Sequence, residues 1–109
     1  MKLTENQKRR FEKMIAEATT DCHDEEEVFS GWASTLEDNL PLPLKCFVFG
    51  EEAVLVGVDM NEGGGAVLGV VQKSKKKARV PIQDIQVKDK TTKSLEWIEA
   101  YRYYIGVIR

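Results

Sequence analysis

The stretch WASTLEDNLPLPLKCFVFG, residues 32–50, marks the point at which the chain changes its secondary structure. Upstream of the prolines, apolar side chains recur every four residues: Val28, Trp32, Leu36 and Leu40. This spacing predicts a helix over about 24–40 with one apolar face. Pro41 and Pro43 then force an extended exit, because proline lacks an N–H and restricts the residue before it.

Downstream of the prolines the chain is rich in valine and divided into short segments. The segments are LKCFVFG, AVLVGVDM, GAVLGVVQK and ARVPIQDIQV, separated by GEE, NEGGG and KSKKK. They predict an antiparallel meander of four or five strands, which we expect to curl into a small barrel-like (SH3-like) sheet. Gly57 and Gly69 fall inside strands, which predicts bulges or sharp bends.

Two more helices flank this arrangement. Residues 4–19 show helical spacing and open with a capping box of Thr4 and Gln7. Residues 92–105 predict a closing helix capped by Thr92 or Ser94. The fold class is therefore α+β, with two N-terminal helices, the small barrel-like sheet and a C-terminal helix. Its aromatic side chains are expected in the core: Trp32, Trp97, Tyr101 and Tyr104.

Length and composition indicate one domain, residues 1–109, with 42% hydrophobic residues and a formal net charge of −2. No segment approaches the ~20 apolar residues of a membrane helix, and the N-terminus is too polar for a signal peptide. We therefore expect a cytoplasmic protein without a membrane partner. Cys22 and Cys46 form no CxxC pair, so both are expected as thiols, with Cys46 buried in a strand.

Enzyme signatures are weak, and we expect no enzymatic activity. His23 is the single histidine, and nothing around it indicates a nucleophile. A zinc site needs four ligands, and only Cys22, His23 and Cys46 are good ones. The NEGGG segment at 61–65 lacks the lysine and hydroxyl of a phosphate-binding loop, so it is interpreted as a hairpin turn.

A basic segment, KSKKKAR at 73–79, supports an alternative function. A small barrel with a basic hairpin can contact nucleic acid or a protein partner. Nucleic-acid platforms pair such charge with aromatic side chains, and no aromatic residue falls between Phe49 and Trp97. Lysines that protect a sheet edge are the favoured interpretation. Nucleic acid is therefore not expected as a partner, and the sequence does not identify a protein partner.

Acidic residues gather at the two ends of the helix over 24–40. Glu27 and Asp38 lie opposite its apolar face but about 16 Å apart along the axis, so one ion cannot touch both. At the C-terminal end, Glu37, Asp38 and Asn39 offer five side-chain oxygens where the helix dipole is negative. The N-terminal cluster is weaker as a site, because acids favour that end of any helix: Asp21, Asp24, Glu25, Glu26 and Glu27. No EF-hand loop is present in the sequence.

Four pieces in order resemble the small prokaryotic calcium-binding proteins of the CcbP type. They are WASTLEDNLPLPLKC, AVLVGVDM, ARVPIQDIQV and EWIEAYRYYIG, spread over about 25–106. The resemblance implies a non-enzymatic bacterial protein that binds Ca²⁺ with low to moderate affinity, as a buffer or a sensor. The acid before the prolines is the motif position, here Glu37 and Asp38. Asp59, Glu62 and Asp84 are further residues expected to complete a coordination shell, with the 24–27 acids as a possible second site.

Overall fold

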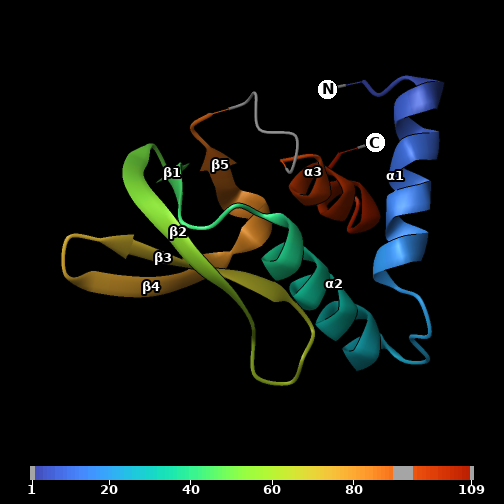
Figure 1. The fold of residues 1–109 in the computed structure, drawn as a ribbon, viewed down its shortest axis with the longest axis horizontal. Helices are drawn as coiled ribbons and strands as arrows, with labels where there is room; N and C mark the ends of the chain where they lie inside the picture. The colour runs from blue at the N-terminus through green and yellow to red at the C-terminus, as the bar shows by residue number, and fades with distance from the viewer. Residues whose placement is uncertain (1, 90–94, 109) are drawn as a thin grey trace.

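The computed structural model describes residues 2–89 and 95–108 and confirms the α+β class. Within these residues the elements follow the predicted order of two helices, a sheet and a closing helix (Figure 1). The helices are α1 (Glu5–Ala18), α2 (Glu25–Asn39) and α3 (Leu95–Tyr104). The strands are β1 (Leu44–Val48), β2 (Glu51–Met60), β3 (Val67–Lys73), β4 (Lys76–Pro81) and β5 (Ile85–Val87), with a 3-10 turn η1 (Ile82–Asp84) between the last two.

The sheet is antiparallel and open, with the strand order β4-β3-β2-β1-β5. Among the described residues β4 and β5 are the two edges and do not pair with each other, so the predicted SH3-like barrel is not confirmed. β5 has only three residues and pairs with β1 alone, while β3 and β4 extend away from the helices as a two-stranded ribbon (Figure 1). A closed barrel would require an edge strand long enough to pair on both sides.

The segment ARVPIQDIQV forms two strands rather than one. β4 ends at Pro81, which has no N–H to donate to a ladder, and the chain turns through η1 before β5 begins. The predicted bulge at Gly57 is confirmed by a register shift between Leu55 and Gly57. The bulge predicted at Gly69 is wrong: the register is regular there, and its missing side chain instead makes room for the methyl groups of Leu55, Ile82 and Ile85.

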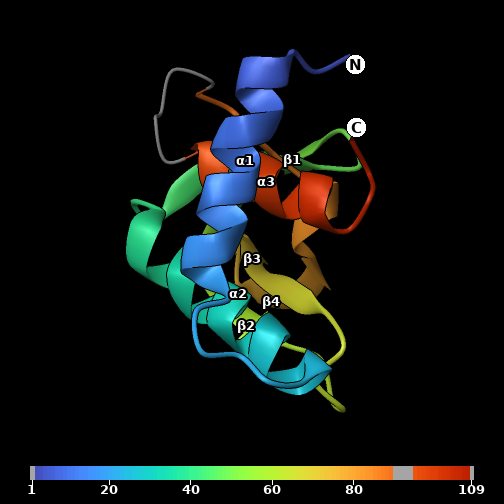
Figure 2. The same ribbon diagram turned by 90° about the vertical axis from the view of Figure 1, so that its right-hand side faces the viewer.

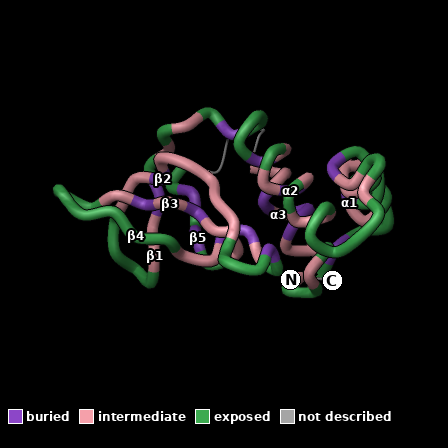
Figure 3. The backbone as a smooth tube through the Cα atoms, turned by 90° about the horizontal axis from the view of Figure 1, so that it is seen from below, coloured by how far each residue is buried: buried purple, intermediate pink, exposed green. Residues whose placement is uncertain are grey.

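Helix α2 is the middle layer of the molecule. It packs on β2 and β3 with one face and meets α1 and α3 with the other, while α1 lies over α3 on the outside (Figures 1 and 2). Its apolar side chains Trp32 and Leu36 are both 0% exposed. In Figure 3 the buried residues follow the inner faces of the sheet and of the helices, whereas the outer side of α1 is exposed.

Aromatic contacts join α2 to α3. The rings of Trp32 and Tyr101 meet edge to face with centroids 5.4 Å apart, and the Tyr101 hydroxyl accepts a hydrogen bond of 3.4 Å from the Val67 N–H at the start of β3. Burial raises the pKa of Tyr101. The core prediction is confirmed for Trp32 and Tyr101, but Trp97 is half-buried and Tyr104 is 40% exposed, because its ring lies at the surface against Trp32.

The predicted caps and thiols are largely confirmed. The Thr4 hydroxyl accepts from the Gln7 N–H at 3.1 Å, and the Gln7 side chain accepts from the Thr4 N–H at 2.8 Å. Cys22 and Cys46 are both free thiols, and Cys46 is buried in β1. The caps predicted for α3, Thr92 and Ser94, lie outside the described residues.

Replacing Gly31 tests the α1–α2 corner. Helix propensity favours alanine by about 1 kcal/mol, but a Cβ at Gly31 would lie 2.5 Å from the Ala18 carbonyl oxygen and 3.2 Å from Cys22 Sγ. Because backbone cannot yield as a side chain does, we expect Gly31→Ala to lower the free energy of unfolding by about 1–3 kcal/mol. Urea denaturation measures this. Gly65→Ala, which meets nothing within 4 Å, is the control, and equal stability of the two variants would contradict the packing argument.

Candidate metal centre

The C-terminal end of α2 carries two acidic side chains that nothing else in the described chain engages. Glu37 and Asp38 lie in the last turn and are exposed. No ion pair or hydrogen bond to a described residue involves either carboxylate. The last turn contains no basic residue. Both carboxylates are therefore open to a cation from solution.

Backbone carbonyls at the same end also lack donors, and the proline exit is the reason. The carbonyls of residues 37 and 39 would bond to the N–H groups four residues on, but Pro41 and Pro43 have none. The carbonyl of residue 38 would bond to Leu42, whose N–H instead donates to Leu40 O at 2.9 Å. Within the described chain, three consecutive carbonyls thus accept no backbone hydrogen bond, next to two carboxylates.

The electrostatics of this end favour a cation. A helix carries about half a negative charge at its C-terminus, and each acid there costs about 0.3–1 kcal/mol. Carboxylates and carbonyls are the hard oxygen ligands that calcium prefers. The arrangement therefore presents an oxygen-rich, negatively charged surface at one place on the fold.

At the N-terminal end of α2, two of the predicted acids act as caps. Asp24 Oδ1 accepts from the Glu27 N–H at 2.8 Å, and Glu27 Oε2 accepts from the His23 N–H at 3.0 Å. One oxygen of each carboxylate therefore accepts a backbone hydrogen bond, and the second oxygen of each is left for a ligand. His23 is exposed and pairs with neither cysteine, since the Cys22 thiol is directed to the Thr20 and Glu27 carbonyls.

The 61–65 turn packs against this end of α2, which sequence reasoning missed. Gly64 is buried with φ +71°, and a Cβ there would lie 2.8 Å from Glu26 Cγ. The turn is held by Asn61, whose carbonyl accepts from the Gly64 N–H at 3.0 Å and whose side chain accepts from the Ala66 N–H at 2.9 Å. The structure therefore places the turn that carries Glu62 beside Glu26. The run of three glycines was the available signal, because close backbone approach requires glycine.

The remaining two predicted ligands lie elsewhere and near cations of the protein itself. Asp59 Oδ2 pairs with Arg79 Nε at 3.4 Å, and Asp59 Oδ1 accepts from the Met60 N–H at 2.8 Å. Asp84 is the last residue of η1 and is one of the acids that favour the charged form of Arg102. Burial lowers the pKa of Arg102, and Glu99 and Asp84 oppose that shift.

The eight predicted ligands do not converge. In the described part of the chain, no group of three or more His, Cys, Asp or Glu side chains is close enough together to hold a metal ion. A bound ion must therefore take part of its shell from backbone carbonyls and water.

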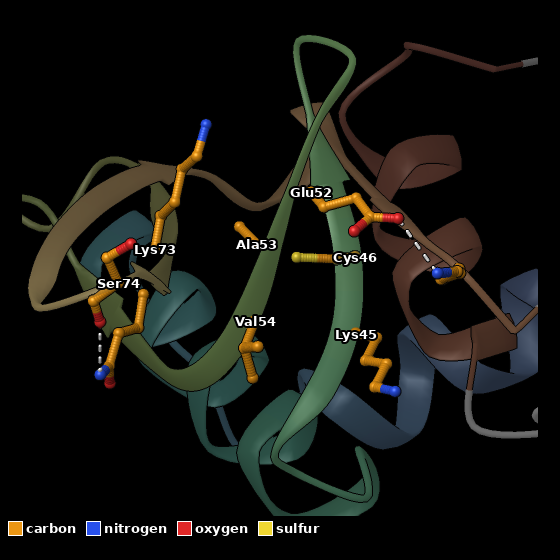
Figure 4. Close-up of a pocket in the computed structure, with 9 residues that line it drawn as sticks. Lys45, Cys46, Glu52, Ala53, Val54, Lys73 and Ser74 are labelled. Atoms are coloured by element: carbon orange, nitrogen blue, oxygen red, sulfur yellow. Dashed lines mark hydrogen bonds and ion pairs between the residues drawn. The ribbon is translucent and has the colours of Figure 1, made fainter.

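The pocket shown in Figure 4 is not suited to a cation. Its wall includes the side chains of Lys45, Lys73 and Lys88 and a single carboxylate, Glu52, which pairs with Lys88 at 3.1 Å. Lys45 and Lys73 point outward on opposite sides, and Cys46 points across the space between the strands. Burial raises the pKa of the Cys46 thiol, so at neutral pH it is a neutral side chain.

The basic 73–79 segment forms the tip of the β3–β4 ribbon. Of its five cations, Lys73 pairs with Glu51 at 3.0 Å and Arg79 with Asp59 at 3.4 Å. The tip carries no aromatic side chain on which a base could stack. The alternative function through this hairpin is therefore not favoured. Separately, no helix of the described residues has the length and apolar character needed to cross a membrane.

Comparison with known proteins identifies the family. A family model described as "Calcium binding", that of the CcbP calcium-binding proteins, matches residues 12–105, so the chain belongs to the CcbP family. The fold is similar to the crystal structure of Anabaena CcbP, with a TM-score of 0.76 and 19% identity over 96% of this chain and 93% of that chain. It is also similar to a structure titled "Calcium binding protein in the calcium-binding form", with a TM-score of 0.74 and 19% identity over 95% and 92% of the two chains. No curated protein sequence matches significantly.

The capping role of Asp24 can be separated from metal binding. Asp24→Ala removes the acceptor for the Glu27 N–H, and we expect the metal-free protein to lose about 1 kcal/mol of unfolding free energy. Asp24→Asn keeps an acceptor oxygen and is expected to lose only a few tenths. Chemical denaturation in a chelator gives both values, and equal losses for the two variants would show that the carboxylate charge, not the cap, is what matters.

Proposed function

We propose that this protein binds Ca²⁺ at the C-terminal end of α2 and acts as a calcium buffer. The carboxylates of Glu37 and Asp38 are the proposed side-chain ligands, and carbonyls of residues 37–39 and water complete the shell. The observation that carries this proposal is the proline exit, which leaves those carbonyls without backbone donors among the described residues, beside two carboxylates that no described residue engages. Membership of a calcium-binding family supports the choice of ion.

The donor set favours calcium over magnesium. Calcium accepts six to eight oxygens at about 2.3–2.6 Å in flexible geometry, whereas magnesium requires near-ideal octahedral geometry and releases water reluctantly. Two adjacent side chains and neighbouring carbonyls form an irregular, open set of oxygens. Such a set retains several water ligands, which supports a low to moderate affinity.

The burial of the helix that carries the proposed ligands supports a buffer role. Trp32 and Leu36 fix α2 between the sheet and α3, and Leu40 just after the helix is 5% exposed. Calcium at this end would neutralise charge without requiring an element of the described fold to move. A sensor, in contrast, needs two conformations that differ in affinity.

A second, weaker calcium site is proposed where the 61–65 turn meets α2. Glu26 and Glu62 are its proposed side-chain ligands, and backbone carbonyls and water complete the shell, because Asp24 and Glu27 each use a carboxylate oxygen to accept a backbone N–H. Asp59 is left out, because an ion there would have to displace Arg79. Asp84 is left out for a related reason, because it faces the charge of Arg102.

The double variant Glu37→Gln/Asp38→Asn tests the main site. It removes two charged ligands, so we expect calcium affinity to fall at least about 10-fold in a calorimetric titration. The same change should raise the stability of the calcium-free protein by up to about 0.3–1 kcal/mol per acid, because both acids oppose the helix dipole. We therefore expect two results together: a lower affinity for calcium and a higher stability of the calcium-free protein.

The matched control is Glu12→Gln/Glu17→Gln on α1, where both acids are exposed and the change in net charge is the same. We expect this control to bind calcium as the wild type does. If both double variants lose calcium affinity equally, the loss is caused by the change in net charge of the protein. That result would contradict a site at residues 37–39. Wild-type protein that binds no calcium would overturn the function itself.

Glu26→Gln/Glu62→Gln tests the second site. We expect the number of calcium ions bound per chain to fall by about one while the tighter site keeps its affinity, because the two ends of α2 lie about 20 Å apart and act independently. Titration with the metal ion alone, in ~0.1 M salt, measures both quantities. Unchanged stoichiometry in this variant would remove the second site from the proposal.

A further inference from the structure

The β1–β2 turn carries an exposed aromatic side chain on a residue with an unfavourable backbone conformation. Phe49 is 82% exposed and has φ +49°, and Gly50 after it has φ +80°. Two positive φ values define a type I′ turn, in which Asn-Gly is the preferred pair. A bulky residue with positive φ is a genuine outlier, and exposure of the ring forgoes the free energy of its burial. Neither feature helps the isolated hairpin fold.

A groove lies directly beside this turn. It has a volume of about 410 Å³ and is lined by Phe49 and Gly50 from the turn, by η1 and β5, and by Arg102, Val107 and Ile108 from the end of the chain. Among the described residues only three large apolar side chains are exposed, and two of them, Phe49 and Val107 (56%), line this groove.

We propose that this face is a homodimer interface in which each copy inserts Phe49 into the groove of the other. The protruding ring and the groove with its apolar wall of Val107 and Ile108 share one face of the molecule. A two-fold axis beside the turn therefore places each ring in the partner's groove, which is the self-complementary arrangement of an isologous dimer.

Charge on the groove favours a second copy over a strongly acidic or basic partner. The groove carries one carboxylate, Asp84, and one guanidinium, Arg102. Arg102 donates to the carbonyls of Gln83 and Ile85, and burial lowers its pKa. Asp84 lies near Arg102 of the same chain, so the two charges balance in the groove, which suits the uncharged ring of a second copy better than a partner of uniform charge.

The small area of the proposed interface also limits the affinity of the two copies for each other. Stable complexes bury about 800 Å² on each partner, and one hairpin turn with a single groove supplies less than that. The dimer is therefore weak and forms at concentrations between about 10 μM and 1 mM. This surface shares no residue with either proposed calcium site, so the two proposals stand or fall separately.

Sedimentation equilibrium of the full chain between about 10 μM and 1 mM, in ~0.15 M salt, tests the interface. We expect the average mass of the wild type to rise toward that of a dimer. Phe49→Asn removes two buried rings per dimer and should weaken association about 100-fold or more. The variant should fold at least as well as the wild type, because Asn-Gly suits a type I′ turn. Val107→Asp, on the groove side, should weaken association as well.

The matched control is Ser74→Asn, which changes the first turn residue of the β3–β4 hairpin, where φ is +56°. It should leave the association constant unchanged. A wild type that stays monomeric to 1 mM overturns the proposal, and so does a dimer that survives Phe49→Asn. Calcium titration of Phe49→Asn should match the wild type, which keeps this result independent of the calcium proposal.

Discussion

The burial of the apolar face of α2 is the constraint on which the rest of the structure depends. Trp32 and Leu36 are fully enclosed between the sheet and α3, and Trp32 meets Tyr101 edge to face. Tyr101 in turn accepts a hydrogen bond from the first residue of β3, so one contact series links α2, α3 and the sheet. With its middle held on two sides, α2 presents its two ends to solvent at fixed places. The acids at those ends therefore lie on a rigid support.

The ion pairs of the sheet explain why the end of α2 is a better place than β2 for the proposed calcium site. Glu51 and Asp59 on β2 pair with cations of the same sheet, Lys73 and Arg79, and Glu52 pairs with Lys88 just after β5. These pairs are exposed and contribute little stability individually, but they leave the β2 carboxylates partly neutralised. Glu37 and Asp38 have no such partner among the described residues. A cation in solution thus meets less competition at the end of α2 than on β2.

Sequence reasoning succeeded where the signal was local. The capping box of Thr4 and Gln7 and the buried face of Trp32 and Leu36 follow from spacing alone. The open sheet, the break at η1 and the contact of Gly64 with Glu26 depend on segments far apart in the chain. No periodicity encodes such pairings. The same limit applies to the site, because sequence names the acids but not the carbonyls that Pro41 and Pro43 leave without donors.

The proline exit connects fold and function at the same place. Pro41 and Pro43 end α2 and direct the chain into β1, which pairs with β2 from Leu44 onward. A helix ended by glycine would satisfy its last carbonyls through backbone bonds to the following turn. Ended by prolines, α2 keeps carbonyls without donors, and the acids beside them add charge that the helix dipole opposes. The end of α2 is thus less stable than a neutral helix end with a glycine exit would be, and in the proposed site a bound cation would offset that loss.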